Sequence, residues 1–157
     1  MLAARALLFA AAVSASPAGK AGDRTHLRLP DRKDDRPYSD AVIVGKTIYL
    51  AGKIGLDAAG KPPAEAAAEA RLVLDGVKAT LQAAGAHMDD LVSVQVFCSD
   101  LTQYDTFNKV YASYFTKNHP ARAFIGSGPL LFGAKFEVQA IAVKPRSEEH
   151  TSELQSQ

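Results

Sequence analysis

Residues 64–98 read AEAAAEARLVLDGVKATLQAAGAHMDDLVSVQVFC, and this stretch contains the two patterns that decide the fold. Its first part has apolar residues at steps of three and four, the spacing of one face of an α-helix. Gly85 is the residue type that typically ends a helix. From Leu91 to Cys98 the pattern changes to alternation, with valines at 92, 94 and 96, which predicts a strand with one strongly apolar face. We therefore expect a helix over 64–84 and a strand over 91–98, packed together through their apolar faces.

The segments before this stretch predict a hairpin. Ala41–Val44 and Thr47–Ala51 are rich in β-branched residues and are joined by Gly45-Lys46, a two-residue loop that suits a type II′ turn. Gly52 interrupts the second of these strands, and residues 55–63, which include two prolines, are expected to form a loop.

The segments after it predict a helix and two more strands. A second helix is expected over 101–115, capped by Ser99-Asp100, with an aromatic-rich stripe at helical spacing that is typical of a core. A short strand over 121–125 and a turn over 126–129 follow, and residues 136–143, FEVQAIAV, alternate as a final strand.

The predicted fold class is α+β, a single mixed β-sheet with two helices on one face, because a sheet with one apolar face must be covered. The opposite face would present Phe97, Ile141 and Val143 among polar residues such as Gln95 and Gln139. A half-apolar face of this kind suggests burial against another subunit.

Composition bounds the function. The chain has 157 residues, 47% hydrophobic and 22% charged, with a formal net charge of +1. The length and the hydrophobic fraction indicate one globular domain and not a mostly disordered chain. The near-neutral charge argues against a protein that binds nucleic acid or anionic lipid through a basic surface. The single cysteine, Cys98, cannot close an internal disulfide and is expected to be a buried, inert thiol, and the sequence has no cluster at zinc-ligand spacing, so no metal site is expected.

The two ends differ from the middle. Residues 1–15, MLAARALLFAAAVSA, fit a signal peptide, which predicts a periplasmic or secreted protein; the alternative is an alanine-rich extension or an upstream start-codon error, and then a cytoplasmic protein. Residues 16–35 are expected as a polar linker and 36–145 as the domain. Residues 146–157 resemble an in-frame translation of a sequencing adapter, the alternative being a natural polar tail.

Two charged residues fall within predicted strands. Arg122 follows Pro120-Ala121, and Glu137 lies out of phase with Phe136 and Val138. Charged side chains in strands need a partner or a ligand. The simplest interpretation is a salt bridge between neighbouring strands, and the alternative is a ligand site.

The sequence resembles the RidA/YjgF family of reactive enamine/imine deaminases over almost all of residues 37–144. Arg122 and Glu137 are separated by 15 residues, which matches the family spacing without a gap. The segments that carry the resemblance are Arg36-Pro37-Tyr38-Ser39, Ile48 to Ile54, Asp100-Leu101 with Phe107-Asn108, Pro120-Ala121-Arg122, and Phe136 to Val143.

The resemblance implies a homotrimer with a chorismate-mutase-like fold and ligand sites in clefts between subunits. It also implies a cofactor-independent hydrolase of the 2-iminobutanoate/2-iminopropanoate deaminase type, which converts 2-enamino or 2-imino acids to 2-keto acids and ammonia. Arg122 would hold the substrate carboxylate through bidentate donors, and Glu137 would position water and exchange protons. Gly52 would let the backbone approach the ligand, Tyr38 would close the cleft, and Asn108 would lie near the site.

The chain departs from the family at three positions. Ala51 and Lys53 flank Gly52 where many members have Ser and Gln, and Phe124 stands where deaminases often have Cys. We expect the altered pocket to favour a substrate with a bulkier or more apolar side chain. Non-deaminating branches typically lack the arginine, which is present here.

Two other classes of function stay open on the sequence. The same trimeric cleft could bind or sense a small carboxylated metabolite without turnover. A chaperone or ribonuclease-like role is the second alternative, although the near-neutral charge argues against an RNA-binding surface. The physiological substrate is not encoded in any motif.

Overall fold

The computed structural model describes residues 24–30, 32 and 35–145. The segments expected to be a signal peptide (1–15) and a non-native tail (146–157) lie outside the described residues. The described chain forms one six-stranded sheet in the order β1-β2-β3-β6-β4-β5. The strands are β1 (Arg24–Leu27), β2 (Ala41–Val44), β3 (Thr47–Ile54), β4 (Leu91–Cys98), β5 (Ala121–Gly126) and β6 (Phe136–Val143).

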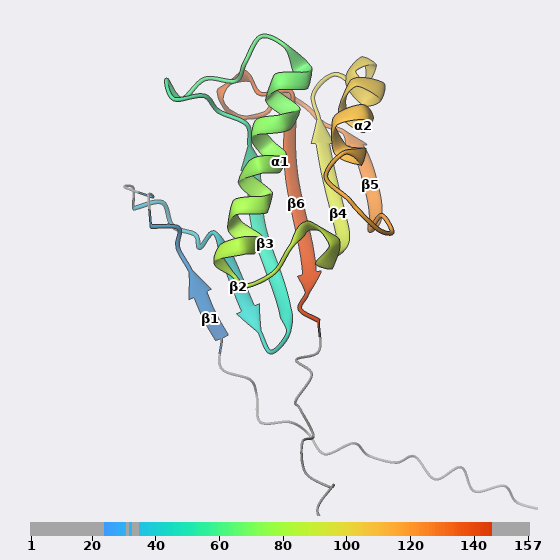
Figure 1. The fold of residues 1–157 in the computed structure, drawn as a ribbon. Coiled ribbons are helices and arrows are strands. Elements are labelled where there is room, and N and C mark those ends of the chain that lie inside the picture. Colours follow the sequence, from blue (N-terminus) through green and yellow to red (C-terminus); the bar gives the residue numbers. More distant parts are fainter. Residues whose placement is uncertain (1–23, 31, 33–34, 146–157) are drawn as a thin grey trace, which may run out of the picture.

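Two helices, α1 (Ala66–Ala83) and α2 (Tyr104–Ala112), cover the same face of this sheet (Figure 1). β4 and β5 pair in parallel, and every other neighbouring pair is antiparallel. The predicted mixed sheet with two helices on one face is therefore confirmed. The described residues also include three short 3-10 helices: η1 (Met88–Asp90), η2 (Leu101–Gln103) and η3 (Leu131–Gly133). Within the described ranges, no helix is long and apolar enough to cross a bilayer.

The core lies between the sheet and α1. Alternate residues of β4 and β6, including Val94, Val96, Phe136 and Val138, are buried against the apolar stripe of the helix, as the two periodicities predicted. Cys98 is buried here, its Sγ lies 3.1 Å from the Asp100 carbonyl oxygen, and burial raises the pKa of its thiol. The expected burial of this thiol is confirmed.

The linker prediction is wrong at residues 24–27. These residues form β1, which pairs antiparallel with β2 from Arg24 opposite Val44 to Leu27 opposite Ala41. The segment was expected to be a linker because it is rich in charge. An edge strand tolerates charged side chains where they reach solvent, and the first three residues of β1 are exposed.

Three further features differ from what the sequence pattern predicts: the orientation of one side chain, the extent of the second helix and the end of β3. Val92 is 46% exposed, because the β4–β6 register shifts between Leu91 and Ser93 and turns its side chain out of the core. The second helix begins as η2, whose Asp100 side chain accepts a bond from the Thr102 amide, and α2 ends at Ala112 rather than at residue 115. Gly52 does not end its strand, which continues to Ile54. Gly45 has a φ of 59° as the hairpin requires.

The sheet face away from the helices is half apolar in the single chain. Tyr49 and Val143 are 48% and 41% exposed, and Gln95 and Gln139 are exposed beside them. A hollow of about 180 Å³ lies on this face between Tyr49, Gln95 and Ile141.

Candidate functional site

A cavity of about 950 Å³ lies at the end of the sheet where β3 ends and β6 begins. Five of the eight predicted site residues line it: Tyr38, Ala51, Gly52, Lys53 and Glu137. The remaining walls come from the segment before β2, the end of β3 with the loop that follows it, and η3. Their lining residues are Arg36 and Asp40, then Ile54, Leu56, Asp57, Ala58 and Gly60, then Leu131 and Phe132.

The Glu137 carboxylate occupies the space above Gly52. Glu137 pairs with Ile54, and the β3–β6 register shifts between Leu50 and Lys53, so that Gly52 lies in the irregular part of the strand. A Cβ added to Gly52 would meet Glu137 Oε1. The sequence predicted that this glycine admits a ligand to the backbone; in the structure its first effect is to make room for the proposed catalytic carboxylate.

Lys53 lines the cavity but is held in an ion pair. Its Nζ lies 2.6 Å from Asp40 Oδ1, and the side chains of Lys53 and Asp40 are only 16% and 7% exposed. The Asp40 carboxylate also accepts bonds from the Leu29 amide (3.0 Å) and from Arg32 (3.2 Å). Burial alone would raise the pKa of Asp40, but the Lys53 bond and then the Leu29 and Arg32 bonds outweigh it and lower the pKa. Lys53 therefore supports the segment before β2 rather than presenting a free cation.

Tyr38 is connected to the same network. The Arg32 guanidinium lies 4.4 Å from the centre of the Tyr38 ring, and the Arg36 guanidinium lies 5.6 Å from it. Because Arg32 also contacts Asp40, the ring at the cavity mouth is connected through two ion pairs to Lys53 in β3.

A second group of predicted residues lies under α2. Arg122 of β5 donates a bond of 2.7 Å to Asn108 Oδ1 of α2, and aromatic rings surround its guanidinium. The ring centroids of Tyr111, Phe124 and Tyr104 lie 4.7, 5.5 and 5.9 Å from it. Among the described residues, the Tyr111 hydroxyl is buried with no hydrogen-bond partner, and burial, against the opposing effect of Arg122, raises the pKa of Tyr111 to about 12. Asn108 and the rings thus fix the orientation of Arg122.

The two groups are separated within one chain. β4 lies between β5 and β6, so the prediction of a salt bridge between neighbouring strands is wrong. Arg122 pairs with Val94, a core residue on the helix face, whereas Glu137 pairs with Phe97, which is out of phase with the core. The two side chains therefore point to opposite faces of the sheet. Two strand spacings and a three-residue offset place their Cα atoms roughly 14 Å apart.

Sequence reasoning missed the residues that support these groups. Glu69 of α1 is fully buried, and its Oε1 accepts bonds from the amides of Lys135 (2.6 Å) and Phe136 (2.9 Å), directly before Glu137. Its position was readable, because Glu69 falls on the apolar stripe, three residues after Ala66 and four before Val73. Tyr111 lies on the aromatic stripe predicted for the second helix, whereas Asp40 had no comparable signal.

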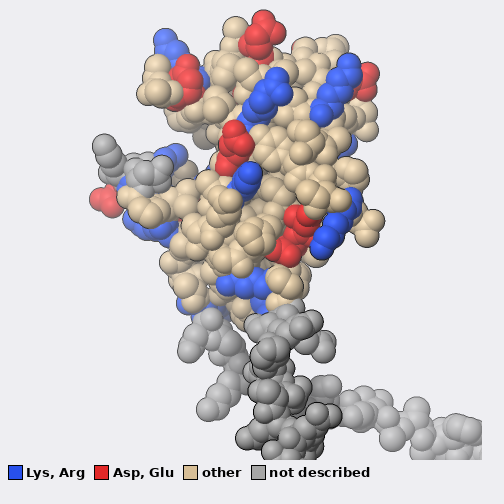
Figure 2. Space-filling model, viewed as in Figure 1, with Lys and Arg blue, Asp and Glu red and all other residues tan. Residues whose placement is uncertain are grey.

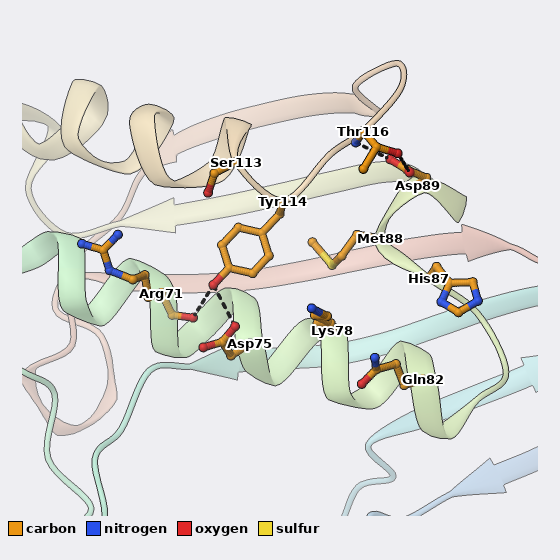
Figure 3. Close-up of a pocket in the computed structure, with 10 residues that line it drawn as sticks. All are labelled: Arg71, Asp75, Lys78, Gln82, His87, Met88, Asp89, Ser113, Tyr114 and Thr116. Carbon is orange, nitrogen blue, oxygen red and sulfur yellow. Dashed lines mark hydrogen bonds between the residues drawn. The ribbon is translucent and has the colours of Figure 1, made fainter.

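A second hollow, of about 510 Å³, lies on the outer side between α1, η1 and the end of α2 (Figure 3). Within it the Tyr114 hydroxyl is 2.8 Å from Asp75 Oδ1, and the Thr116 amide and hydroxyl donate to Asp89, which lowers the pKa of Asp89. Burial and the Asp75 bond raise the pKa of Tyr114 to about 12. This hollow contains none of the predicted site residues, and both of its carboxylates already accept bonds from neighbouring hydroxyls.

Comparison with known proteins shows the family of the chain. Residues 32–144 match the family model described as Endoribonuclease L-PSP. A Bos taurus protein named 2-iminobutanoate/2-iminopropanoate deaminase is 38% identical over 110 residues, which cover 69% of this chain and 80% of the relative.

Two solved structures from Escherichia coli are similar to the model. The yjgF gene product superimposes with a TM-score of 0.67 and 37% identity, covering 71% of this chain and 91% of that one. TdcF with bound serine superimposes with a TM-score of 0.68 and 30% identity, covering 81% of this chain and all of that one. In both cases the shared region includes most of the described fold.

Proposed function

Because the chain belongs to the Endoribonuclease L-PSP family, which includes RidA and YjgF, we propose that it hydrolyses small 2-imino and 2-enamino acids to 2-keto acids and ammonia. Its curated relatives at 36–38% identity carry the name of that activity. The observation that carries the proposal is the presence of two half-sites, each built around one of the charged residues that the reaction needs.

Arg122 binds the substrate carboxylate. Its guanidinium offers a planar pair of donors, which match the two oxygens of a carboxylate, and the bond to Asn108 restrains its rotation. The surrounding rings of Tyr104, Tyr111 and Phe124 lower the local dielectric and so strengthen that ion pair.

Glu137 exchanges protons. An enamine becomes an imine when C3 gains a proton and the nitrogen loses one, and water then adds to C2. The Glu137 carboxylate accepts a proton from that water and passes it to the nitrogen, which gives a carbinolamine. It then accepts the hydroxyl proton and passes this second proton to the same nitrogen, so that the C–N bond breaks and ammonia leaves as the C=O bond forms. The net reaction consumes one water per imine and needs no other reactant.

The complete site lies between subunits of a homotrimer. A three- or four-carbon acid cannot reach both Arg122 and Glu137 of one chain, because they point to opposite faces of the sheet. A neighbouring copy whose β5 and α2 approach the cavity would supply Arg122 and Asn108 to the half-site of Glu137, Gly52 and Tyr38. The half-apolar sheet face around Tyr49 and Ile141 is the surface that such packing would cover.

The direct test measures imine hydrolysis. An amino acid oxidase with catalase generates imino acids from alanine or 2-aminobutyrate, and semicarbazide traps whatever remains unhydrolysed. The purified chain should suppress the trapped adduct, and Arg122→Lys and Glu137→Gln should lose nearly all of this effect. Arg71→Lys and Glu65→Gln, on the outer side of α1 and before it, are the matched controls and should keep it. Retained activity in either site variant would refute the assignment.

Ribonuclease activity is the second candidate, since the family description names it. The net charge is +1, and acidic side chains lie beside basic ones over the helix-covered face (Figure 2). Binding to RNA through phosphates requires clustered basic residues and weakens steeply with salt. A filter-binding and cleavage assay at moderate salt distinguishes this candidate from the deaminase, and keto-acid binding without ammonia release would instead indicate a non-catalytic metabolite binder.

A further inference from the structure

Two large apolar side chains stand at the rim of the Glu137 cavity. Leu131 and Phe132, in η3, are 68% and 64% exposed, the highest values among the exposed large hydrophobic side chains of the described residues. Both line the cavity together with Tyr38 and Glu137. Apolar residues held in solvent beside a catalytic carboxylate need an explanation other than core packing.

The backbone at Phe132 directs this side chain outward. Phe132 has φ 61° and ψ 10°, and among the described residues it is the only one other than glycine with a positive φ. A bulky residue is disfavoured in this left-handed region, where Gly or Asn would be easier to accommodate. The turn is closed by the bond from the Ala134 amide to the Leu131 carbonyl (3.1 Å), which leads directly into β6. The fold therefore tolerates strain at a position whose ring adds nothing to the core.

The wall between this rim and Glu137 is also apolar. Ile54 pairs with Glu137 across β3 and β6, so that their side chains lie on the same face of the sheet. Leu56 follows in the loop and lines the same cavity. These side chains and those of the rim thus form an apolar wall of the cavity that contains Glu137.

We propose that Leu131 and Phe132, with Ile54, form the subsite for the substrate side chain and select imino acids that carry branched aliphatic or aromatic groups. This inference rests on the proposed function. An imino acid has three substituents at C2: the carboxylate goes to Arg122, the nitrogen and the attacking water go to Glu137, and the side chain is left to the apolar wall.

Other residues that could set this preference are engaged elsewhere. The Lys53 ammonium pairs with Asp40. Phe124 packs against Tyr104 and Phe107 with ring centroids 4.9 and 5.6 Å apart, in the half-site that binds the carboxylate. We therefore assign the preference for a bulkier substrate side chain, expected from Lys53 and Phe124, to Leu131 and Phe132 at the rim.

The test compares substrates on the full chain. Imino acids are generated from alanine, leucine and phenylalanine, and the ratio of kcat/KM for the leucine- and alanine-derived substrates is measured for Leu131→Ala and Phe132→Gly. Each variant should lower this ratio about ten-fold, mainly through the larger substrate, because removing a few carbons from an apolar pocket has that effect. Val92→Ala, an exposed apolar residue at the other end of β4, is the control and should leave the ratio unchanged.

Binding of the product provides a second readout. Calorimetry with 4-methyl-2-oxopentanoate and pyruvate should show the same loss of preference in the two rim variants. An unchanged ratio in both assays would overturn the subsite. A change in the mass of the assembly, measured by light scattering on the two variants, would also overturn it, because the side chains would then serve a contact between subunits. If the wild-type chain hydrolyses no imine but the binding ratio shifts, the deaminase proposal fails and the subsite stands.

Discussion

Arg122 and Glu137 are positioned on opposite faces of one sheet, on two strands that flank β4. Each has its own supports: Asn108 and three aromatic rings orient the guanidinium, and Gly52 leaves room for the carboxylate. A site that uses both residues on one small substrate must combine two chains. Mixing two variants that each lack one of these residues can therefore test whether the site is shared.

The first prediction is complementation between two inactive variants. Arg122→Ala and Glu137→Gln are each expected to be inactive, but equal amounts refolded together should recover about a quarter of the wild-type rate. In random mixed trimers, about one interface in four receives Arg122 from one chain and Glu137 from the next. No recovery in trimers shown by mass spectrometry to be mixed would place the site within a single chain.

The second prediction concerns Gly52. A methyl group at this position would displace the Glu137 carboxylate, and a misplacement of about 1 Å costs roughly 100-fold in rate. Gly52→Ala should therefore lower kcat by about 100-fold while the protein still folds and assembles. Gly128→Ala, where an added Cβ meets nothing within 4 Å, is the matched control and should be near wild type. Comparable rates for the two variants would contradict the close contact.

The third prediction concerns the Lys53–Asp40 pair. Lys53→Met leaves the buried Asp40 carboxylate with one partner fewer and should lower the free energy of unfolding by about 1–3 kcal/mol. Lys46→Met, at the exposed hairpin turn, should change it by less than about 0.5 kcal/mol. Urea denaturation of the two variants measures the difference, and equal midpoints would show that the ion pair adds nothing.

The fourth prediction gives the pH dependence of the same carboxylate. The pKa of Asp40 is lowered in the folded protein, so its contribution to stability is fully present above the ordinary value near 3.8 and is lost as the pH falls through the lower folded pKa. The stability of the wild type should therefore fall in this acid range more steeply than that of Asp40→Asn. Parallel pH profiles for the two proteins would contradict the shift.

The fifth prediction concerns Glu69. Glu69→Ala leaves the buried amides of Lys135 and Phe136 without an acceptor and should lower the free energy of unfolding by about 3 kcal/mol. Glu69→Gln keeps an oxygen for both amides and should lose only about 1 kcal/mol. The exposed Glu65→Ala serves as control. A large loss of kcat in Glu69→Gln without loss of stability would instead indicate a role in the chemistry.

The core of this fold could be predicted from periodicity because its causes are local. A spacing of three and four in α1 and of two in β4 and β6 determines which face is apolar, and these elements were placed correctly. Val92 fails this rule because a bulge depends on the partner strand, which no pattern within β4 records. β1 fails for a similar reason, since its pairing with β2 outweighs its polar composition.

The sequence could predict which residues belong to the candidate site, but not how they are arranged relative to one another. The residues came from a family resemblance, and five of them share one cavity while Arg122, Asn108 and Phe124 form a second group. Strand order decides this separation, and strand order follows from long-range pairing that a linear pattern does not contain. The supports were missed because a buried carboxylate such as Asp40 differs from an exposed one only in its tertiary partners.

The position of β5 at the edge of the sheet has a consequence for the fate of the chain in a cell. Among the described strands, β5 pairs only with β4, so its outer backbone groups have no strand partner. Uncovered edges of this kind recruit other chains and promote aggregation. The strand that carries Arg122 is therefore also one of the two edges at which another chain can pair. Substitutions that weaken assembly are expected to deplete the soluble protein as well as to slow its reaction.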